Sequence, residues 1–336
     1  MTIANLRGKL LLSLAFGMAV ILALGIYADL PRLAQTLAGF NWLLVPVILG
    51  LTLVNYTLRF VKWQYFLRTL AIPEMPTRQS LLIFVSGFSM VVTPGKVGEW
   101  LKSILLKQAT GVPFSASAPI IIAERLSDGL AMALLASAAL IVYGYGWQTL
   151  GTAALLGLAV VVLSQYRPLA QRVIALASRL PLVAQRVQQV ETFYESAKQL
   201  LHWRSLGVAI GLGVVSWAAE GVAFYLVLVA LGIAASATLL LQAVSILSAA
   251  TIAGAISMLP GGLAVAEGSI AGLLLVLRAT DDPTVAAAAT ILIRFATLWF
   301  GVSLGIVALS VLSQGTSLRG LDEVQPDRGG GDTRRG

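Results

Sequence analysis

Long apolar runs separated by short polar segments dominate the chain. A helix that crosses a bilayer needs about 20 mostly apolar residues. The pattern predicts six such helices, over residues 10–28, 41–58, 118–142, 149–165, 206–231 and 285–312. Arg7 and Lys9 precede the first run as they would in a signal peptide, but no small-residue cleavage site stands out and further spans follow. We therefore expect this helix to be retained.

Two further apolar stretches, residues 80–106 and 238–277, are each interrupted by a Pro-Gly pair, at Pro94-Gly95 and Pro260-Gly261. Proline and glycine stop a helix there and free backbone polar groups. Within a membrane, such groups persist only where protein or a water-filled cavity satisfies them. We expect each stretch to form a re-entrant hairpin, which enters the membrane and returns to the same side.

The distribution of basic residues supports the hairpins. With a cytoplasmic N-terminus and two re-entrant stretches, most of the 23 Lys and Arg residues fall on the cytoplasmic side, including Lys62, Lys102 and those of the long loop 166–204. If residues 80–106 simply crossed, that loop would lie outside, against the positive-inside rule. The sequence thus predicts an all-α polytopic membrane protein with six spanning helices, two re-entrant broken-helix hairpins and cytoplasmic termini.

Residues 166–204 alternate basic and apolar positions at helical spacing. This pattern predicts amphipathic helices on the inner leaflet, and a solvated connector is the alternative. We place the transmembrane domain at residues 1–314. The Gly/Arg/Asp-rich tail, residues 315–336, is expected to be disordered.

Composition narrows the function classes. The 336 residues are 58% hydrophobic and 11% charged, with a mean hydropathy of +0.87, against about 45–50% and 25% in soluble domains. A soluble enzyme is therefore excluded. The net charge of +8 indicates topology and contact with anionic lipid rather than nucleic acid. Cysteine is absent and His202 is the single histidine, so we expect no metal and no cofactor.

The two interrupted stretches resemble each other. Each has Ser-Met, then Pro-Gly, then a glutamate beside a glycine, and each is followed by an apolar helix that carries an arginine: Ser89, Pro94, Glu99 and Arg125 in one, Ser257, Pro260, Glu267 and Arg294 in the other. In the predicted topology the repeats, residues 80–142 and 238–312, have opposite orientations. Interrupted helices in inverted repeats indicate a transport site near the bilayer midplane. Chance similarity between two Pro-Gly segments is the alternative.

The motifs at residues 93–100, 124–128 and 260–268, with the basic-aromatic segment 59–63, resemble the transmembrane domain of the lysylphosphatidylglycerol synthase/flippase family. The resemblance implies a lipid flippase-type domain. Full-length members of that family also carry a soluble aminoacyltransferase domain after the last helix. Because the sequence ends soon after residue 312, we expect no lysyl-lipid synthesis.

An ionisable residue at a helix centre costs about 2.5–3.5 kcal/mol unless it is paired or hydrated. Ionisable residues at predicted membrane depth are therefore the candidate site. Arginine can bind two phosphate oxygens and lysine adds a point charge. The predicted headgroup-binding residues are Lys96, Glu99, Glu124, Arg125, Asp128, Glu267 and Arg294, with cavity backbone from Pro94, Gly95, Gly98, Pro260, Gly261 and Gly262, and with Arg59, Lys62, Trp100 and Glu220 as secondary candidates. Internal ion pairs that fix helix register are the alternative.

The leading hypothesis is a flippase, not an enzyme, that moves a phosphate-bearing lipid, anionic or aminoacylated, between leaflets. No nucleotide-binding loop is present. An intramembrane lipid- or polyprenyl-phosphate hydrolase, with Ser86, Ser89 or Ser257 as its nucleophile, is the runner-up. A non-transporting partner of envelope-biogenesis enzymes is the third hypothesis. By resemblance we expect a bacterial inner membrane location, and a homo-oligomer is possible.

Overall fold

The computed structural model describes residues 29–93, 99–142, 146–168 and 186–322, together with positions 19, 171, 172 and 176. Every regular element in these ranges is a helix. The first predicted span, residues 10–28, lies outside the described residues except for Ala19, and so does the first predicted break, residues 94–98.

The helices form two sets with the same order of elements. Each set has a short helix, a long helix, a pair of helices joined by a break, and another long helix. The first set is α2 (Leu30–Ala38), α3 (Val45–Thr69), α4 (Thr77–Ser86) with the 3-10 turn η2 (Gly87–Met90), α5 (Leu101–Thr110) and α6 (Phe114–Val142). The second is α10 (Val187–Leu200), α11 (Trp203–Ala230), α12 (Ala237–Ile256), η4 (Pro260–Gly262), α13 (Val265–Val276) and α14 (Pro283–Arg294).

Four further elements complete the described chain. The 3-10 turn η1 (Trp42–Leu44) leads into α3, and α7 (Gly146–Gln165) follows α6 and packs against it. After α14 the helix continues through a π-helical turn, η5 (Phe295–Trp299), into α15 (Phe300–Asp322). A π-turn inside a long helix is often found at functional sites.

Local sequence signals explain where the helices begin. The Ser236 hydroxyl accepts a hydrogen bond from the Leu239 amide (3.0 Å) at the start of α12. The Asp282 carboxylate accepts from the Thr284 amide (2.7 Å) at the start of α14, where Pro283 supplies a helical φ. Side-chain oxygens at these positions satisfy amides that lack a partner within the helix.

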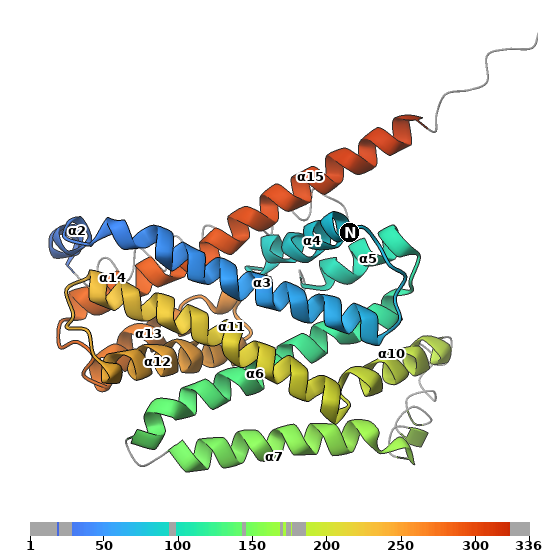
Figure 1. Ribbon diagram of the computed structural model, residues 1–336, viewed down its shortest axis with the longest axis horizontal. Coiled ribbons are helices and arrows are strands. Elements are labelled where there is room, and N and C mark those ends of the chain that lie inside the picture. The colour runs from blue at the N-terminus through green and yellow to red at the C-terminus, as the bar shows by residue number, and fades with distance from the viewer. Residues whose placement is uncertain are drawn as a thin grey trace, which may run out of the picture.

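The two long helices α3 and α11 lie side by side and antiparallel at the centre of the bundle (Figure 1). The Asn41 amide donates to the Ala230 carbonyl (3.0 Å), which ties the beginning of α3 to the end of α11. Midway along both helices the Asn55 amide group donates to the carbonyl and hydroxyl oxygens of Ser216, each at 2.9 Å. The two sets of helices therefore meet at matching positions of their long helices.

The paired shorter helices lie at opposite ends of the molecule (Figure 1). The α4–α5 pair has both outer ends beside the end of α3, whereas the α12–α13 pair has both outer ends beside the end of α11. Helix α6 packs against α12, and correspondingly α15 packs against α4 and η2. The arrangement has the inverted relation that the sequence predicts for its two repeats.

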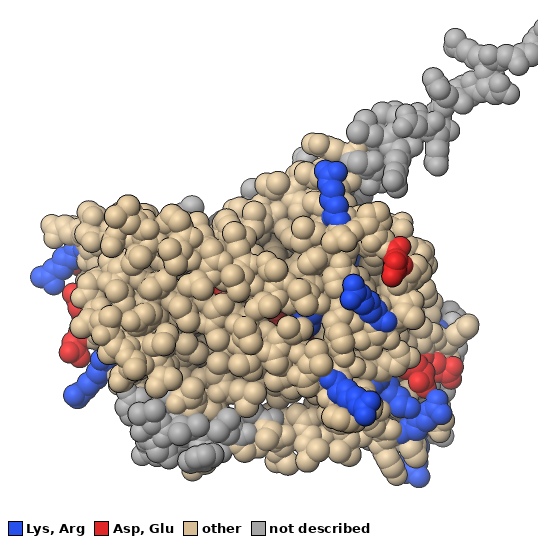
Figure 2. Space-filling view, viewed as in Figure 1, with Lys and Arg blue, Asp and Glu red and all other residues tan. Residues whose placement is uncertain are grey.

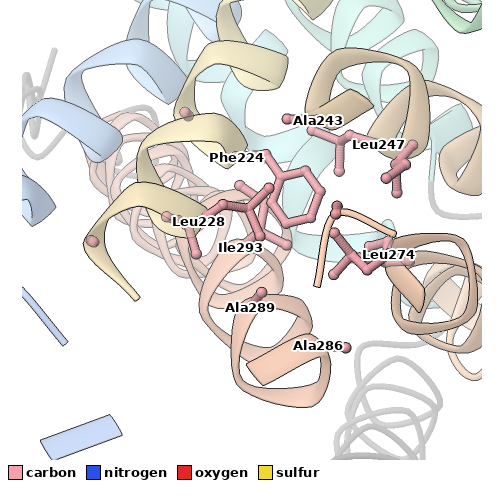
Figure 3. Packing of buried hydrophobic residues seen from close by; sticks show 14 of the residues in the cluster. Phe224, Leu228, Ala243, Leu247, Leu274, Ala286, Ala289 and Ile293 are labelled. Atoms are coloured by element: carbon pink, nitrogen blue, oxygen red, sulfur yellow. The ribbon is translucent and has the colours of Figure 1, made fainter. Parts of the chain in front are cut away.

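Two apolar cores hold the bundle together, each built mainly from one set with a few residues from the other. Figure 3 shows the core of the second set, in which Phe224 and Leu228 of α11 meet Leu247 of α12, Leu274 of α13 and Ile293 of α14. The core of the first set is more aromatic, with Trp63 and Phe66 of α3 against Phe84 of α4 and Leu106 of α5. The polar side chains described below lie between these two cores.

The outer surface suits a lipid environment. Figure 2 shows charged side chains gathered toward the two ends of the helices, with a broad uncharged band between them. Four helical segments among the described residues are long and apolar enough to cross a membrane: Trp42–Thr69, Trp203–Ala230, Ala237–Ile256 and Pro283–Gln314. The chain is an all-helical, multi-pass membrane protein.

Two predicted boundaries differ from the structure. The helix predicted over residues 41–58 continues as α3 to Thr69, because the polar groups of Arg59 and Lys62 find partners inside the bundle. Helix α15 continues to Asp322, past residue 315 where the sequence predicts the tail to begin, and residues 323–336 lie outside the described range.

Close packing of α15 on η2 gives a stability prediction. A Cβ atom at Gly305 would lie 2.2 Å from the Ser89 amide nitrogen and 2.8 Å from the Phe88 carbonyl carbon, so the two backbones would have to separate. Gly305→Ala should lower the stability by about 1–3 kcal/mol, measured by thermal unfolding in detergent. Gly211→Ala on α11 is the control, because a Cβ there meets nothing within 4 Å. Equal melting temperatures for both variants would contradict the packing.

Candidate site between the two helix breaks

A cavity of about 480 Å³ lies between α3, α6, α11, α14, the turn η2 and the second helix break. Its wall combines apolar side chains with a concentration of polar and charged ones. The polar lining residues are Tyr56, Arg59, Glu99, Lys102, Arg125, Asp128, Trp217, Glu220, Thr251, Arg294 and Thr297. Each set of helices contributes to this wall, so the cavity lies on the boundary between them.

The second break lines the cavity and lies close to Val92, near the end of the part of the first set's broken helix that the structure describes. Gly261 and Gly262 have positive φ angles (62° and 68°), which glycine adopts without strain. A Cβ at Gly261 would lie 3.1 Å from Cγ1 of Val92, which immediately precedes the first break. The Arg294 guanidinium donates to the Gly261 carbonyl (2.9 Å). An internal side chain thus satisfies backbone that the break frees from the helix.

The two repeats contain equivalent ion pairs. The Arg125 Nε lies 3.2 Å from a Glu99 carboxylate oxygen, and the Arg294 Nε lies 2.6 Å from a Glu267 carboxylate oxygen. In each pair the glutamate follows a helix break and the arginine lies on the next helix. The side chain of Arg125 is the more accessible, with 37% of its surface exposed against 13% for Arg294.

Asp128 of α6 is the centre of a basic cluster. It forms an ion pair and hydrogen bond with the buried Lys62 of α3. Its second carboxylate oxygen lies 3.9 Å from Nε of Arg59 and 3.6 Å from a terminal nitrogen of Arg125, without a hydrogen bond to either. Three cations therefore share one carboxylate. The guanidinium groups of Arg59 and Arg125 keep N–H donors that this carboxylate does not use.

Lys102 is a buried member of the site that the sequence analysis placed on the cytoplasmic side. It is 6% exposed and forms an ion pair with Glu124 of α6. Its ammonium also lies 4.9 Å from the ring centre of Trp63 and 5.3 Å from that of Phe84, where the aromatic faces attract a cation. Its alkyl chain runs over Gly87, where a Cβ would be 2.8 Å from Cγ of the lysine.

Arg59 and Glu220 occupy matching positions on the two central helices. They are separated by 161 residues, as are Asn55 and Ser216. The Arg59 guanidinium lies between the rings of Phe88 (5.4 Å) and Trp217 (5.6 Å). Glu220 is 5% exposed and lines the cavity. Within the described part of the chain it forms no ion pair or hydrogen bond.

The π-turn η5 separates this cavity from a second hollow. Thr297 faces the polar cavity, and its carbonyl accepts a hydrogen bond from the Tyr56 hydroxyl (2.5 Å). Phe295 and Trp299 of the same turn line an apolar groove of about 460 Å³, together with the beginning of α3. A polar and an apolar hollow thus lie on different faces of one helical turn.

The structure brings together most of the predicted site residues that it describes. Glu99, Arg125, Asp128, Arg294, Gly261 and Gly262 line the cavity, and so do the secondary candidates Arg59 and Glu220. Glu124, Glu267 and Lys62 lie behind the wall, each paired with a base or acid of the site. Trp100 packs on Phe114 (5.7 Å) and is not a lining residue. Pro94, Gly95, Lys96 and Gly98 lie outside the described residues.

Several lining residues were missed because the sequence gives them no distinctive pattern. Tyr56, Trp217 and Thr297 are ordinary members of apolar helices, and only the crossing of α3, α11 and α14 brings them together. Lys102 had a usable signal, since it follows Glu99 by three positions and so shares its helical face. Among the described residues no cluster of His, Asp or Glu is suited to hold a metal ion.

Comparisons with known proteins place this architecture in a family. The family model of the lysylphosphatidylglycerol synthase transmembrane region matches residues 10–305. A UPF0104 membrane protein of Methanothermobacter thermautotrophicus is 24% identical over 318 residues, which cover 87% of this chain and 90% of that protein. Since the matched region includes both helix breaks and all the ionised residues of the cavity, the chain belongs to the lysylphosphatidylglycerol synthase transmembrane-region family.

Proposed function

We propose that the protein is a flippase, which moves a phosphate-bearing lipid between the two leaflets through the cavity described above. The observation that carries the proposal is the pair of equivalent ion pairs, Glu99–Arg125 and Glu267–Arg294, placed beside two helix breaks of opposite orientation. Inverted repeats with interrupted helices are typical of transporters whose site lies near the midplane.

The proposed topology has six spanning helices and two re-entrant hairpins, α4–α5 and α12–α13. The outer ends of each pair lie at one end of the bundle, which supports a return to the same side (Figure 1). Helix α6 is long enough to cross but carries Glu124, Arg125 and Asp128, and all three are paired inside. Helix α12, which is 20 residues long and mostly apolar, is by length able to cross the bilayer on its own.

The lipid phosphate is proposed to bind Arg125 and Arg59. Both guanidinium groups line the cavity, and both approach Asp128 only at 3.6–3.9 Å. A phosphate can accept several charge-assisted hydrogen bonds from such groups. The acyl or prenyl chains would remain in lipid, and the apolar groove beside η5 offers one of them an apolar surface.

Lipid hydrolysis has less support. A hydrolase needs a nucleophile next to a base, and Ser89 instead donates its hydroxyl to the Ser86 carbonyl (2.7 Å). We therefore propose a transporter rather than an enzyme. A non-transporting partner of envelope enzymes would leave the buried charges unexplained.

We also propose a bacterial inner membrane location with cytoplasmic termini and contact of the loop 166–204 with the inner leaflet, and a homo-oligomer fits the same function.

Transport is tested with the purified protein in sealed vesicles of phosphatidylethanolamine and phosphatidylglycerol. Trace amounts of fluorescent phosphatidylglycerol, phosphatidic acid, phosphatidylethanolamine and polyprenyl phosphate are added singly, and a membrane-impermeant quencher reports their leaflet. The proposal predicts that at least one of the phosphate lipids equilibrates between leaflets faster than in protein-free vesicles. If none of the four lipids moves faster than in protein-free vesicles, the proposal is contradicted.

Arg125→Gln should reduce the transport rate at least about tenfold, because a charge-assisted hydrogen bond contributes about 1.5–3 kcal/mol. Arg125→Lys should be less severe, since it keeps the charge but loses the planar fork. The control is Arg204→Gln, at the exposed beginning of α11. The same rate in Arg125→Gln and the control would show that this guanidinium does not bind the lipid.

Exchanging the charges of Glu267 and Arg294 distinguishes a role of this pair in lipid binding from a role in fixing helix register. Each single variant, Glu267→Arg or Arg294→Glu, leaves like charges in a buried site and should reduce the yield of folded protein. In the double variant opposite charges face each other again, and we expect the folded yield to recover while transport stays low. Recovery of both folding and transport would show that the pair serves only helix register.

A further inference from the structure

The described site contains equal numbers of basic and acidic residues. The bases are Arg59, Lys62, Lys102, Arg125 and Arg294, and the acids are Glu99, Glu124, Asp128, Glu220 and Glu267. Four pairs account for eight of these groups: Lys62–Asp128, Lys102–Glu124, Arg125–Glu99 and Arg294–Glu267. The two remaining groups are Arg59 and Glu220.

Glu220 differs from every other acid of the site because it contacts none of the bases. Arg59 of α3 and Arg294 of α14 face it at longer range, and so does the acidic Asp128 of α6. Tyr56 of α3 also faces it. Helix α12, which packs against α11 here, contains no ionisable residue. The carboxyl group of Glu220 is therefore buried at the wall of the cavity, without a cation bound to it.

An anionic headgroup would disturb this balance. With all groups ionised, the described site is neutral, and a phosphate diester would add one negative charge inside a low-dielectric region. Uncompensated charge is costly there. Arg59 can hold the phosphate, since it is free of a close carboxylate partner at hydrogen-bond distance. Its counterpart Glu220 would then be the one carboxylate that no base among the described residues neutralises.

We propose that Glu220 is a proton-coupling residue, which takes up one proton when the cavity binds a lipid phosphate and gives it back when the lipid leaves. This inference rests on the flippase function proposed above. The proton comes from water on the side to which the cavity is open, adds to a carboxylate oxygen of Glu220, and returns to water on the other side. One proton thus travels with one anionic headgroup, and the loaded site stays neutral.

The proposed coupling makes lipid binding and proton uptake reciprocal. Binding of an anionic lipid should strengthen as the pH falls, by up to about tenfold for each pH unit if one proton is linked. A proton gradient across the vesicle should then drive lipid from the acidic side toward the alkaline side. A zwitterionic headgroup brings its own ammonium group and should show a weaker dependence.

The variant that tests the proposal is Glu220→Gln, which resembles the protonated side chain and cannot titrate. The matched control is Glu191→Gln, on the exposed face of α10. Both proteins and the wild type are reconstituted, and transport of the lipid that the wild type moves fastest is measured with and without a gradient of one pH unit. In weakly buffered detergent, a pH dye records proton uptake when short-chain phosphatidylglycerol is added.

We expect the wild type and Glu191→Gln to respond to the gradient and to take up protons with the lipid. Glu220→Gln should lose both responses, so that any lipid exchange it retains is independent of the gradient, and Glu220→Asp should recover the responses in part. If wild-type lipid movement ignores the gradient, or if Glu220→Gln responds like the wild type, the coupling proposal is overturned and the flippase proposal stands. If the wild type moves no lipid at all, the flippase proposal itself is wrong.

Discussion

A charged side chain within a lipid bilayer needs a partner, and this requirement dictates how the helices pack within each half of the protein. Charges at a helix centre cost about 2.5–3.5 kcal/mol each, and this protein brings five bases and five acids together inside the bundle among its described residues. Most pairs join different helices, such as Lys62 of α3 with Asp128 of α6. Separating the helices would expose these charges to hydrocarbon, so the ion pairs specify the assembly as well as forming the site.

The helix breaks pose the same problem for the backbone. Freed carbonyl groups at the second break would be unsatisfied in lipid, and Arg294 satisfies one of them by binding the Gly261 oxygen while it also binds Glu267. Close approach of small residues makes this possible, as at Gly254 and Gly262, whose backbones are in near contact. In the second repeat charge pairing and backbone interruption are therefore parts of one arrangement, and the first repeat contains the equivalent Glu99–Arg125 ion pair.

The sequence predicted the helical membrane fold, the paired breaks and most of the ionised residues, because charges and Pro-Gly pairs stand out against an apolar background. It could not predict the pairing. Lys96 and Glu99 lie close together in the sequence, just after Pro94-Gly95. The structure instead pairs Glu99 with Arg125, which lies on α6. Lys62 and Lys102 were placed at the cytoplasmic side, since their depth depends on partners that only the packing of α3 and α5 against α6 provides.

The central claim is that a polar, water-accessible cavity lies between the breaks within the membrane. Since the chain has no cysteine, single cysteines can be introduced at Thr251, which lines the cavity, and at Val215, a 58% exposed residue on the outer face of α11. A charged thiol reagent applied to intact membranes should label the cysteine at position 251, and short-chain anionic lipid should slow that labelling. The cysteine at position 215 should remain unlabelled by the reagent. If the cysteine at position 251 is as unreactive as that at position 215, the cavity is not accessible to water and the account is contradicted.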